Sequence, residues 1–317
     1  MYIGIDLGGT KIAAAITNSH NNEIAKIIVR PTETEQGRAK VFENICKCID
    51  ELLESVEASK STLKAIGFGV PGRINNNIIL NAPNLPGWDN VNLAEMLQEK
   101  YPVPVYLEND ANAAALAELL YGAGVGKKDF LYMTVSTGIG GGIISEGKLL
   151  TGHNHTAGEI GHMIIQPEGT LCGCGQKGCL EAMASGTHLT NRLRQRLAED
   201  KPKTKVLELA NNKPEQATTK HLAEAAKAGD SFAIELIKEN ARYIAFGINN
   251  YIQLLDPELI IIGGGLANFG DIFFNEINNY LNIIHHNVGV LLAPVVKSPL
   301  AQDSGVLGAV ALAIEGV

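Results

Sequence analysis

One histidine and three cysteines lie close together in the middle of the chain and could hold a metal ion. They are His162, Cys172, Cys174 and Cys179, with the spacing His-x9-Cys-x-Cys-x4-Cys. One imidazole and three thiolates form the ligand set of a closed structural zinc site. Reduced thiols without a metal are the alternative interpretation, and His153 and His155 are rival candidates for the nitrogen ligand.

Two glycine-rich turns could bind phosphate, because a backbone without side chains lets N–H groups approach phosphate oxygens closely. The first turn contributes Asp6, Gly8, Gly9, Thr10 and Lys11, and the second contributes Thr137, Gly138 and Gly140. Neither turn matches the P-loop or the dinucleotide fingerprint in the order of its residues. A hairpin turn that simply requires glycine is the alternative for each one. Two such turns facing each other could clamp a triphosphate, and Gly264 and Gly265, after an apolar run, could carry the purine.

Asp110 follows an apolar run and precedes an alanine-rich segment, which predicts a junction between a strand and a helix. An acid at this position is either the cap of the helix or a general base at the carboxyl end of a strand, where α/β sheets bind ligands. Asn109, beside it, can both donate hydrogen bonds to a hydroxyl-rich ligand and accept them from it.

The elements that must position these residues are predicted to occur twice. Residues 2–18 and 130–146 each form two β-rich runs around a glycine tip, and each pair is followed by a strand that ends in glycine. Apolar residues at helical spacing predict long helices at 38–57 and 231–255. Residues 199–220 are polar and predict a solvated excursion. We therefore expect two α/β lobes, one of residues 1–110 and 300–317 and a larger one of residues 111–299 that carries the zinc loop.

Composition excludes several classes of function. The 317 residues carry a net charge of −8, which argues against a surface that binds nucleic acid or anionic membrane. No apolar run approaches the roughly 20 residues that a membrane-spanning helix requires. The first residues lack the pattern of a signal peptide, and an odd number of cysteines, five, suits a reducing compartment. We predict a cytoplasmic protein. Cys46 and Cys48, on a predicted helix, are interpreted as packing residues.

The motifs taken together resemble the ROK family (repressors, open reading frames and sugar kinases). The similarity covers essentially the whole chain. It is carried by Asp6–Lys11 (Asp-Leu-Gly-Gly-Thr-Lys), Gly69–Gly72 (Gly-Val-Pro-Gly), Glu108–Asn112 (Glu-Asn-Asp-Ala-Asn), Gly158–His162 (Gly-Glu-Ile-Gly-His) and Cys172–Glu181. The resemblance implies a two-lobed actin-like ATPase fold of the hexokinase and ribonuclease H type, with a ligand cleft between duplicated α/β domains.

The resemblance also implies a role for each motif. Asp110 would be the base that acts on a sugar hydroxyl, and the two glycine turns with Gly264 and Gly265 would hold ATP and Mg²⁺. His162 and the three cysteines would hold structural zinc. The implied contacts to the sugar are Gly72, Asn84, Asn109, Asp110, Glu159, His162 and Glu181.

Within the family, the pattern is most similar to the bacterial glucokinases, which implies transfer of the γ-phosphoryl group of ATP to the 6-hydroxyl of glucose. A kinase for N-acetylglucosamine or N-acetylmannosamine is the alternative, and a non-catalytic sugar sensor on the same fold is the alternative from another class. The partners implied are a hexose and ATP. A dimer is the family's usual form, so we expect a homodimer, with a tetramer as the alternative.

Overall fold

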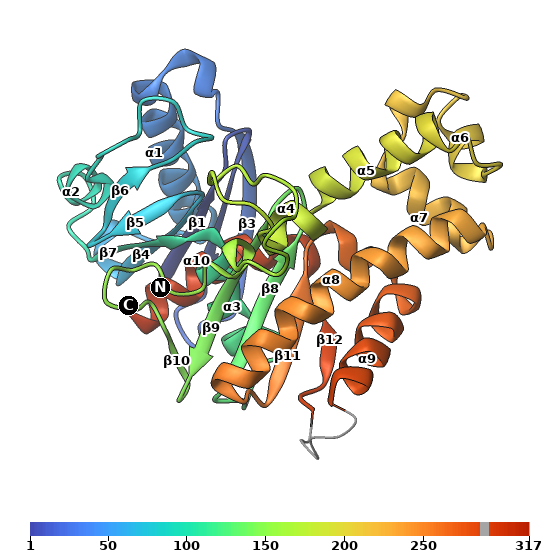
Figure 1. Ribbon diagram of the computed structural model, residues 1–317. Coiled ribbons are helices and arrows are strands. Elements are labelled where there is room, and N and C mark those ends of the chain that lie inside the picture. Colours follow the sequence, from blue (N-terminus) through green and yellow to red (C-terminus); the bar gives the residue numbers. More distant parts are fainter. Residues whose placement is uncertain (286–291, 317) are drawn as a thin grey trace. The chain divides into compact units, whose positions relative to one another are not determined.

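The computed structural model describes residues 1–285 and 292–316 of the chain (Figure 1). Contacts between residues divide it into two compact units. Unit 1 consists of Met1–Lys128, Gly142–Gly158 and Pro299–Val317, and unit 2 consists of Asp129–Gly141 and Glu159–Ser298. The division passes through strand β9 (Ile139–Ser145), whose first residues belong to unit 2 and whose last residues belong to unit 1.

Unit 1 is built on a mixed sheet with the strand order β3-β2-β1-β4-β7. The strands are β1 (Tyr2–Leu7), β2 (Lys11–Thr17), β3 (Ile24–Pro31), β4 (Ala65–Val70) and β7 (Val105–Asn109). The first three are antiparallel, whereas β1, β4 and β7 are parallel. Asp6 pairs with Gly69, and Gly69 pairs with Glu108. The carboxyl ends of three parallel strands therefore meet at one edge of the sheet.

Because side chains along a strand alternate between the two faces of this sheet, each face packs against different helices. Ile12 and Ile16 of β2 join the core that contains α1, whereas Ala13 and Ala15 pack with apolar residues of α10. The helices of unit 1 are α1 (Arg38–Ser55), α2 (Leu93–Gln98), α3 (Asp110–Tyr121) and α10 (Ser304–Glu315). Strands β5 (Arg73–Asn75) and β6 (Ile78–Asn81) form a separate two-stranded hairpin in unit 1.

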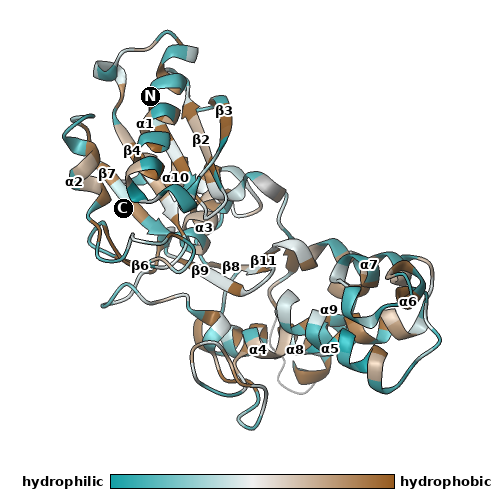
Figure 2. Ribbon diagram, turned by 90° about the horizontal axis from the view of Figure 1, so that it is seen from above, coloured by the Kyte–Doolittle hydropathy of each residue, from teal (hydrophilic) through white to brown (hydrophobic). Residues whose placement is uncertain are grey.

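Helix α1 shows how the apolar spacing of the sequence becomes a buried face. Figure 2 shows both hydrophilic and hydrophobic residues along α1. Its buried residues include Cys46, which is 6% exposed, and Cys48, which is fully buried. The prediction that these two cysteines are packing residues is confirmed.

The second sheet repeats the design of the first, with the strand order β10-β9-β8-β11-β12. Its other strands are β8 (Phe130–Val135), β10 (Lys148–Leu149), β11 (Leu259–Gly263) and β12 (Val295–Lys297). Strands β8, β11 and β12 are parallel, and β10 is antiparallel to β9. The predicted duplication of an α/β design is therefore present in the strand order itself.

Unit 2 carries the remaining helices. They are α4 (Leu180–Ala184), α5 (Gly186–Glu199), α6 (Lys205–Leu209), α7 (Thr219–Lys227), α8 (Ser231–Leu255) and α9 (Asp271–His285). The prediction of a solvated excursion at 199–220 was wrong in part, because Val206, Ala210 and Ala217 are fully buried. Three apolar residues set among many polar ones were too sparse to reveal this packing. Among the described residues, no helix is both long and apolar enough to cross a membrane.

Candidate active site and metal centre

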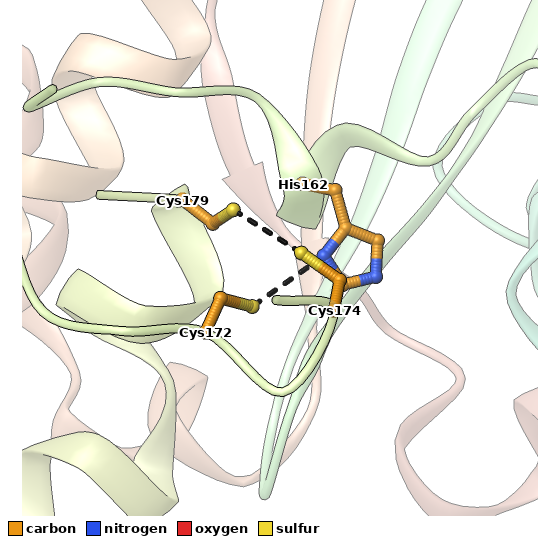
Figure 3. A group of neighbouring side chains, drawn as sticks. All are labelled: His162, Cys172, Cys174 and Cys179. Carbon is orange, nitrogen blue, oxygen red and sulfur yellow. Dashed lines mark hydrogen bonds between the residues drawn. The ribbon is translucent and has the colours of Figure 1, made fainter. Parts of the chain in front are cut away.

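The predicted metal ligands come together in unit 2. His162 ends a single 3-10 turn (Ile160–His162), and Cys179 is the residue before α4. Figure 3 shows the four side chains pointing toward one another. Their ligand atoms all lie within 4.8 Å of one another, in a group that contains neither His153 nor His155, both of which the structure describes.

Two of the separations between the four ligand atoms match those expected around a tetrahedral zinc ion. Zinc bonds of about 2.3 Å to sulfur and 2.0–2.1 Å to nitrogen place neighbouring ligand atoms about 3.5–3.8 Å apart. Cys174 Sγ lies 3.6 Å from Cys179 Sγ, and Cys172 Sγ lies 3.7 Å from His162 Nδ1. The nitrogen turned toward the sulfurs is therefore Nδ1, and Nε2 lies 4.0 Å from Glu159 Oε2. A metal on Nδ1 would leave Nε2 of His162 available to Glu159 or to a ligand.

The junction between β7 and α3 assigns the helix cap to Asn109. The Asn109 side-chain oxygen accepts a hydrogen bond from the Ala111 backbone N–H at 2.9 Å, which is the geometry of an N-cap. The Asn109 amide group donates to the Gly72 carbonyl oxygen at 2.9 Å. Asp110 occupies the first helical position. The cap of α3 is therefore Asn109 and not Asp110.

Asp6 lies close enough to Asp110 for the two carboxylates to interact electrostatically. Burial, followed by the charge of Asp110, raises the pKa of Asp6 to about 6, and Lys11 opposes that rise. Gly69 lies between Asp6 and Glu108 in the sheet, and a Cβ added there would lie 4.0 Å from the Asp110 Cα. A carboxylate pair at the carboxyl ends of parallel strands is an arrangement for a metal ion, a proton transfer or both.

The first glycine turn is held from behind by the segment after β3. The Thr32 hydroxyl donates to the Gly8 carbonyl oxygen at 2.6 Å, and the Thr34 hydroxyl donates to the Gly9 carbonyl oxygen at 3.3 Å. A Cβ on Gly9 would lie 2.6 Å from the Asn84 carbonyl oxygen. Thr10 and Lys11 are exposed, so the outer side of the turn is accessible to a ligand. No sequence motif indicated the two supporting threonines.

The second glycine turn, between β8 and β9, rests against Glu181. The Ile139 backbone N–H donates to Glu181 Oε2 at 2.9 Å. A Cβ on Gly138 would lie 2.5 Å from the same oxygen. Glu181 Oε1 in turn lies 3.9 Å from Cys172 Sγ. Glu181, predicted as a sugar contact, therefore also touches this turn and the metal ligands.

Unit 2 contains a cavity of about 470 Å³ that is lined by this turn and by residues that follow β11. Its lining includes Thr137 and Gly265, both predicted to hold ATP, together with Thr187, Asn191 and Arg194 of α5. The volume suits a small-molecule ligand. Gly264 has a φ of 83°, and a Cβ there would lie 2.5 Å from the Val135 carbonyl oxygen. Sequence reasoning missed the polar residues of α5, since hydroxyl and amide groups on a helix have no distinctive spacing.

The remaining predicted sugar contacts are spread over both units. In unit 1, Gly72 has a φ of 126°, and a side chain there would collide with the Asn81 carbonyl oxygen. Asn84 lies behind Gly9, as described above. In unit 2, the side chain of Glu159 is 53% exposed. Each of these residues lies in the same unit as at least one other residue predicted to hold the sugar.

The sequence model of the ROK family matches residues 2–316. The chain belongs to the ROK family. It is 38% identical to a glucokinase of Thermotoga maritima over 99% of this chain and 98% of that protein. A ROK family glucokinase of Streptomyces griseus, solved in complex with glucose and AMPPNP, is 33% identical and matches with a TM-score of 0.81 over 99% of each chain. A ROK hexokinase of Thermus thermophilus is 34% identical and matches with a TM-score of 0.84, over 99% of this chain and 98% of the other.

The fold is the actin-like ATPase fold of ROK sugar kinases, as the resemblance implied. The two sheets with a common strand order are its duplicated domains. Each unit supplies one of the glycine turns, and unit 1 supplies the carboxylate pair.

Proposed function

We propose that this protein is a glucokinase, an ATP-dependent kinase that transfers the γ-phosphoryl group to the 6-hydroxyl of glucose. The single observation that carries the proposal is the carboxylate pair of Asp6 and Asp110 at the carboxyl ends of β1 and β7, the two strands that flank β4, in a chain similar over its whole length to glucokinases. A sugar sensor would have no need of such a pair.

Asp110 is the proposed general base. As the hexose oxygen attacks the γ-phosphorus, its proton passes to the Asp110 carboxylate, and the bond between that phosphorus and the bridging oxygen of ADP breaks. Proton removal of this kind contributes about 10²–10⁴-fold to rate. Asn109 caps α3, the helix that begins with Asp110, and its amide retains a second N–H for a sugar hydroxyl.

The glycine turns are the proposed phosphate sites. Asp6, Gly8, Gly9, Thr10 and Lys11 would serve ATP and Mg²⁺ in unit 1, and Thr137, Gly138, Gly140, Gly264 and Gly265 would serve ATP in unit 2. Mg²⁺, when bound, would neutralise charge on the phosphates, and Asp6 is the residue of this set that can hold it. The cavity beside Thr137 and Gly265 is the proposed adenosine site.

The proposed hexose contacts in unit 1 are Gly72, Asn84, Asn109 and Asp110. Those in unit 2 are Glu159, His162 and Glu181. His162, Cys172, Cys174 and Cys179 would hold a structural zinc ion that fixes the imidazole ring, so that Nε2 faces the sugar. The predicted homodimer or tetramer and the predicted cytoplasmic location stay predictions.

A coupled assay of ADP release tests the function. The purified protein is supplied with ATP, Mg²⁺ and, one at a time, glucose, mannose, N-acetylglucosamine and N-acetylmannosamine. We expect the highest kcat/KM with glucose. A higher value with either N-acetylhexosamine would assign the alternative specificity, and no release above background with any sugar would contradict a kinase.

A further inference from the structure

Glu181 joins two parts of unit 2 that lie far apart in the sequence. It follows the metal ligand Cys179 by two residues and lies in the first turn of α4. One carboxylate oxygen, Oε2, accepts from the Ile139 backbone N–H at 2.9 Å, and the other, Oε1, lies 3.9 Å from Cys172 Sγ. A single side chain therefore touches both the metal ligands and the phosphate turn of unit 2.

The turn is packed tightly against this carboxylate. Gly138 leaves room for it, since a Cβ there would lie 2.5 Å from Oε2. Because backbone N–H groups of the turn are the proposed phosphate donors, a shift of the Ile139 amide would move the neighbouring donors as well. Glu181 is placed to fix the turn before nucleotide arrives.

The chain on either side of the metal ligands holds the same turn. The Gly186 N–H donates to the Ser136 carbonyl oxygen at 2.6 Å, and the Thr187 N–H donates to the Thr137 carbonyl oxygen at 3.3 Å. On the side of His162, Gly161 packs so closely on the Ile139 carbonyl oxygen that a side chain would collide with it. Displacement of the metal ligands would therefore disturb the turn from two directions.

A simpler reading is that Glu181 is an acid in the first turn of a helix, where negative charge is favourable. That role needs no contact outside the helix, yet both oxygens lie against groups from other segments. We infer that Glu181 is a positioning residue that couples the metal cluster, and through it the sugar, to the nucleotide-binding turn. This inference rests on the proposed function for the identity of the two ligands.

Coupling of this kind has a reciprocal consequence. If glucose or zinc holds Glu181 in place and thereby raises nucleotide affinity, the nucleotide raises glucose affinity by the same factor. Couplings between sites typically correspond to about 5–150-fold in affinity. We expect a value near the lower end, about tenfold, because one hydrogen bond and one packing contact carry it.

The test is calorimetric titration of the zinc-loaded protein with AMPPNP and Mg²⁺, without sugar. Glu181→Ala should weaken AMPPNP binding about tenfold. Glu181→Gln should stay within about threefold of the parent, because an amide oxygen can still accept from the Ile139 N–H. The matched control is Glu159→Ala, which removes another proposed sugar carboxylate, one that lies 4.0 Å from His162 Nε2 and outside the glycine turn. It should weaken glucose binding and leave AMPPNP binding unchanged.

Two further arms keep the result decisive. Gly138→Ala should weaken AMPPNP binding in the parent but much less in the Glu181→Ala background, since the added methyl group collides with the carboxylate; a double-mutant cycle measures this coupling. Removing zinc with a chelator should likewise weaken AMPPNP binding in the parent and add little in Glu181→Ala. If Glu181→Ala proves unfolded by circular dichroism, Gly138→Ala in the zinc-loaded protein carries the test, and parent-like AMPPNP affinity in this variant would overturn the inference.

Parent-like AMPPNP affinity in folded, zinc-loaded Glu181→Ala would overturn the inference, and so would fully additive losses in the cycle. Failure of the proposed function looks different. In that case the parent would release no ADP with glucose, while the effect of Glu181→Ala on AMPPNP binding would persist.

Discussion

At the end of β7, two neighbouring residues divide two tasks. Asn109 caps α3 and bonds the Gly72 carbonyl oxygen, while Asp110 supplies a carboxylate in the first turn. Either residue type can cap a helix, so the sequence alone left the role of Asp110 open. The structure identifies Asn109 as the cap, because the Asn109 oxygen is the one that accepts from the Ala111 N–H. The role of Asp110 as the base stays a proposal.

The substitution Asp110→Asn tests the proposed base. Asparagine keeps the shape and most of the hydrogen-bonding reach of aspartate but cannot take the proton. We expect kcat for glucose to fall at least 100-fold, while glucose affinity measured by calorimetry stays within a few-fold of the parent. Turnover within tenfold of the parent would show that Asp110 is not the base.

Asp6 is costly to the fold, which points to a functional role. Its pKa rises from an ordinary 3.8 to about 6 through burial and the charge of Asp110. A folded-state pKa above the unfolded value favours the protonated form, so any stabilisation is present below pH 3.8 and is lost as pH rises through 6. At neutral pH the ionised carboxylate costs the fold on the order of 3 kcal/mol. A bound cation would offset this cost.

A pH profile follows from the raised pKa of Asp6. If Asp6 must be ionised to hold Mg²⁺, kcat/KM for MgATP should fall as the pH drops below about 6, the value for the free enzyme. Carbon-13 NMR of the aspartate carboxyls provides the direct measurement. The pKa of Asp6 should decrease in Asp110→Asn, because one of its two causes is removed. An Asp6 that titrates near 4 in the parent would refute this account.

At the scale of elements, each proposed phosphate turn is supported by a residue that the family resemblance places at the sugar. Gly9 packs on Asn84 in unit 1, and Gly138 packs on Glu181 in unit 2. Both glycines are therefore required by protein neighbours behind the turn, in addition to any phosphate in front of it. The two glycine turns of the duplicated fold are therefore supported in the same way.

Gly9→Ala is the corresponding prediction for unit 1. The new methyl group would lie 2.6 Å from the Asn84 carbonyl oxygen, so the turn, the Asn84 segment or both must move. We expect both the KM for ATP and the Kd for glucose to rise several-fold. The control is Thr10→Ala, which trims an exposed side chain of the same turn and should affect only ATP. Unchanged glucose affinity in Gly9→Ala would mean that the Asn84 segment does not hold the sugar.

The sequence predicted the elements of the site better than it predicted their contacts. The hairpins around Gly8 and Gly138 were predictable because strand periodicity and glycine turns are local signals. The grouping of His162 with the three cysteines was predictable from spacing, although the choice of His162 over His153 and His155 required the structure. The contacts of Glu181 with Ile139 and of Gly9 with Asn84 join segments far apart in the chain, and no local pattern encodes them.

At the scale of the whole molecule, the last helix of the chain completes the first unit. Helix α10 packs on β1, β4 and α3. Gly4, Gly67 and Gly308 line these contacts, and a Cβ at any of them would collide with backbone atoms of the opposing element. Because glycine has no side chain, the helix approaches the sheet closely, and unit 1 packs residues 304–315 against residues 2–7 and 65–70.

Gly67→Ala tests the packing of α10 on β4. The added methyl group would collide with the Ala309 carbonyl oxygen and would lie 2.8 Å from the Ala313 nitrogen. Because both are backbone atoms of a helix, no side chain can move aside, and overpacking of this kind typically costs about 1–3 kcal/mol.

The only tryptophan of the sequence, Trp88, is fully buried in the core of unit 1, so its fluorescence reports the unfolding of that unit in urea. We expect the midpoint of the Trp88 transition to fall in Gly67→Ala and to stay unchanged in Gly173→Ala, where a Cβ would meet no atom within 4 Å. Equal midpoints for Gly67→Ala and the parent would show that α10 has room to move and that its contact with β4 does not limit the stability of unit 1.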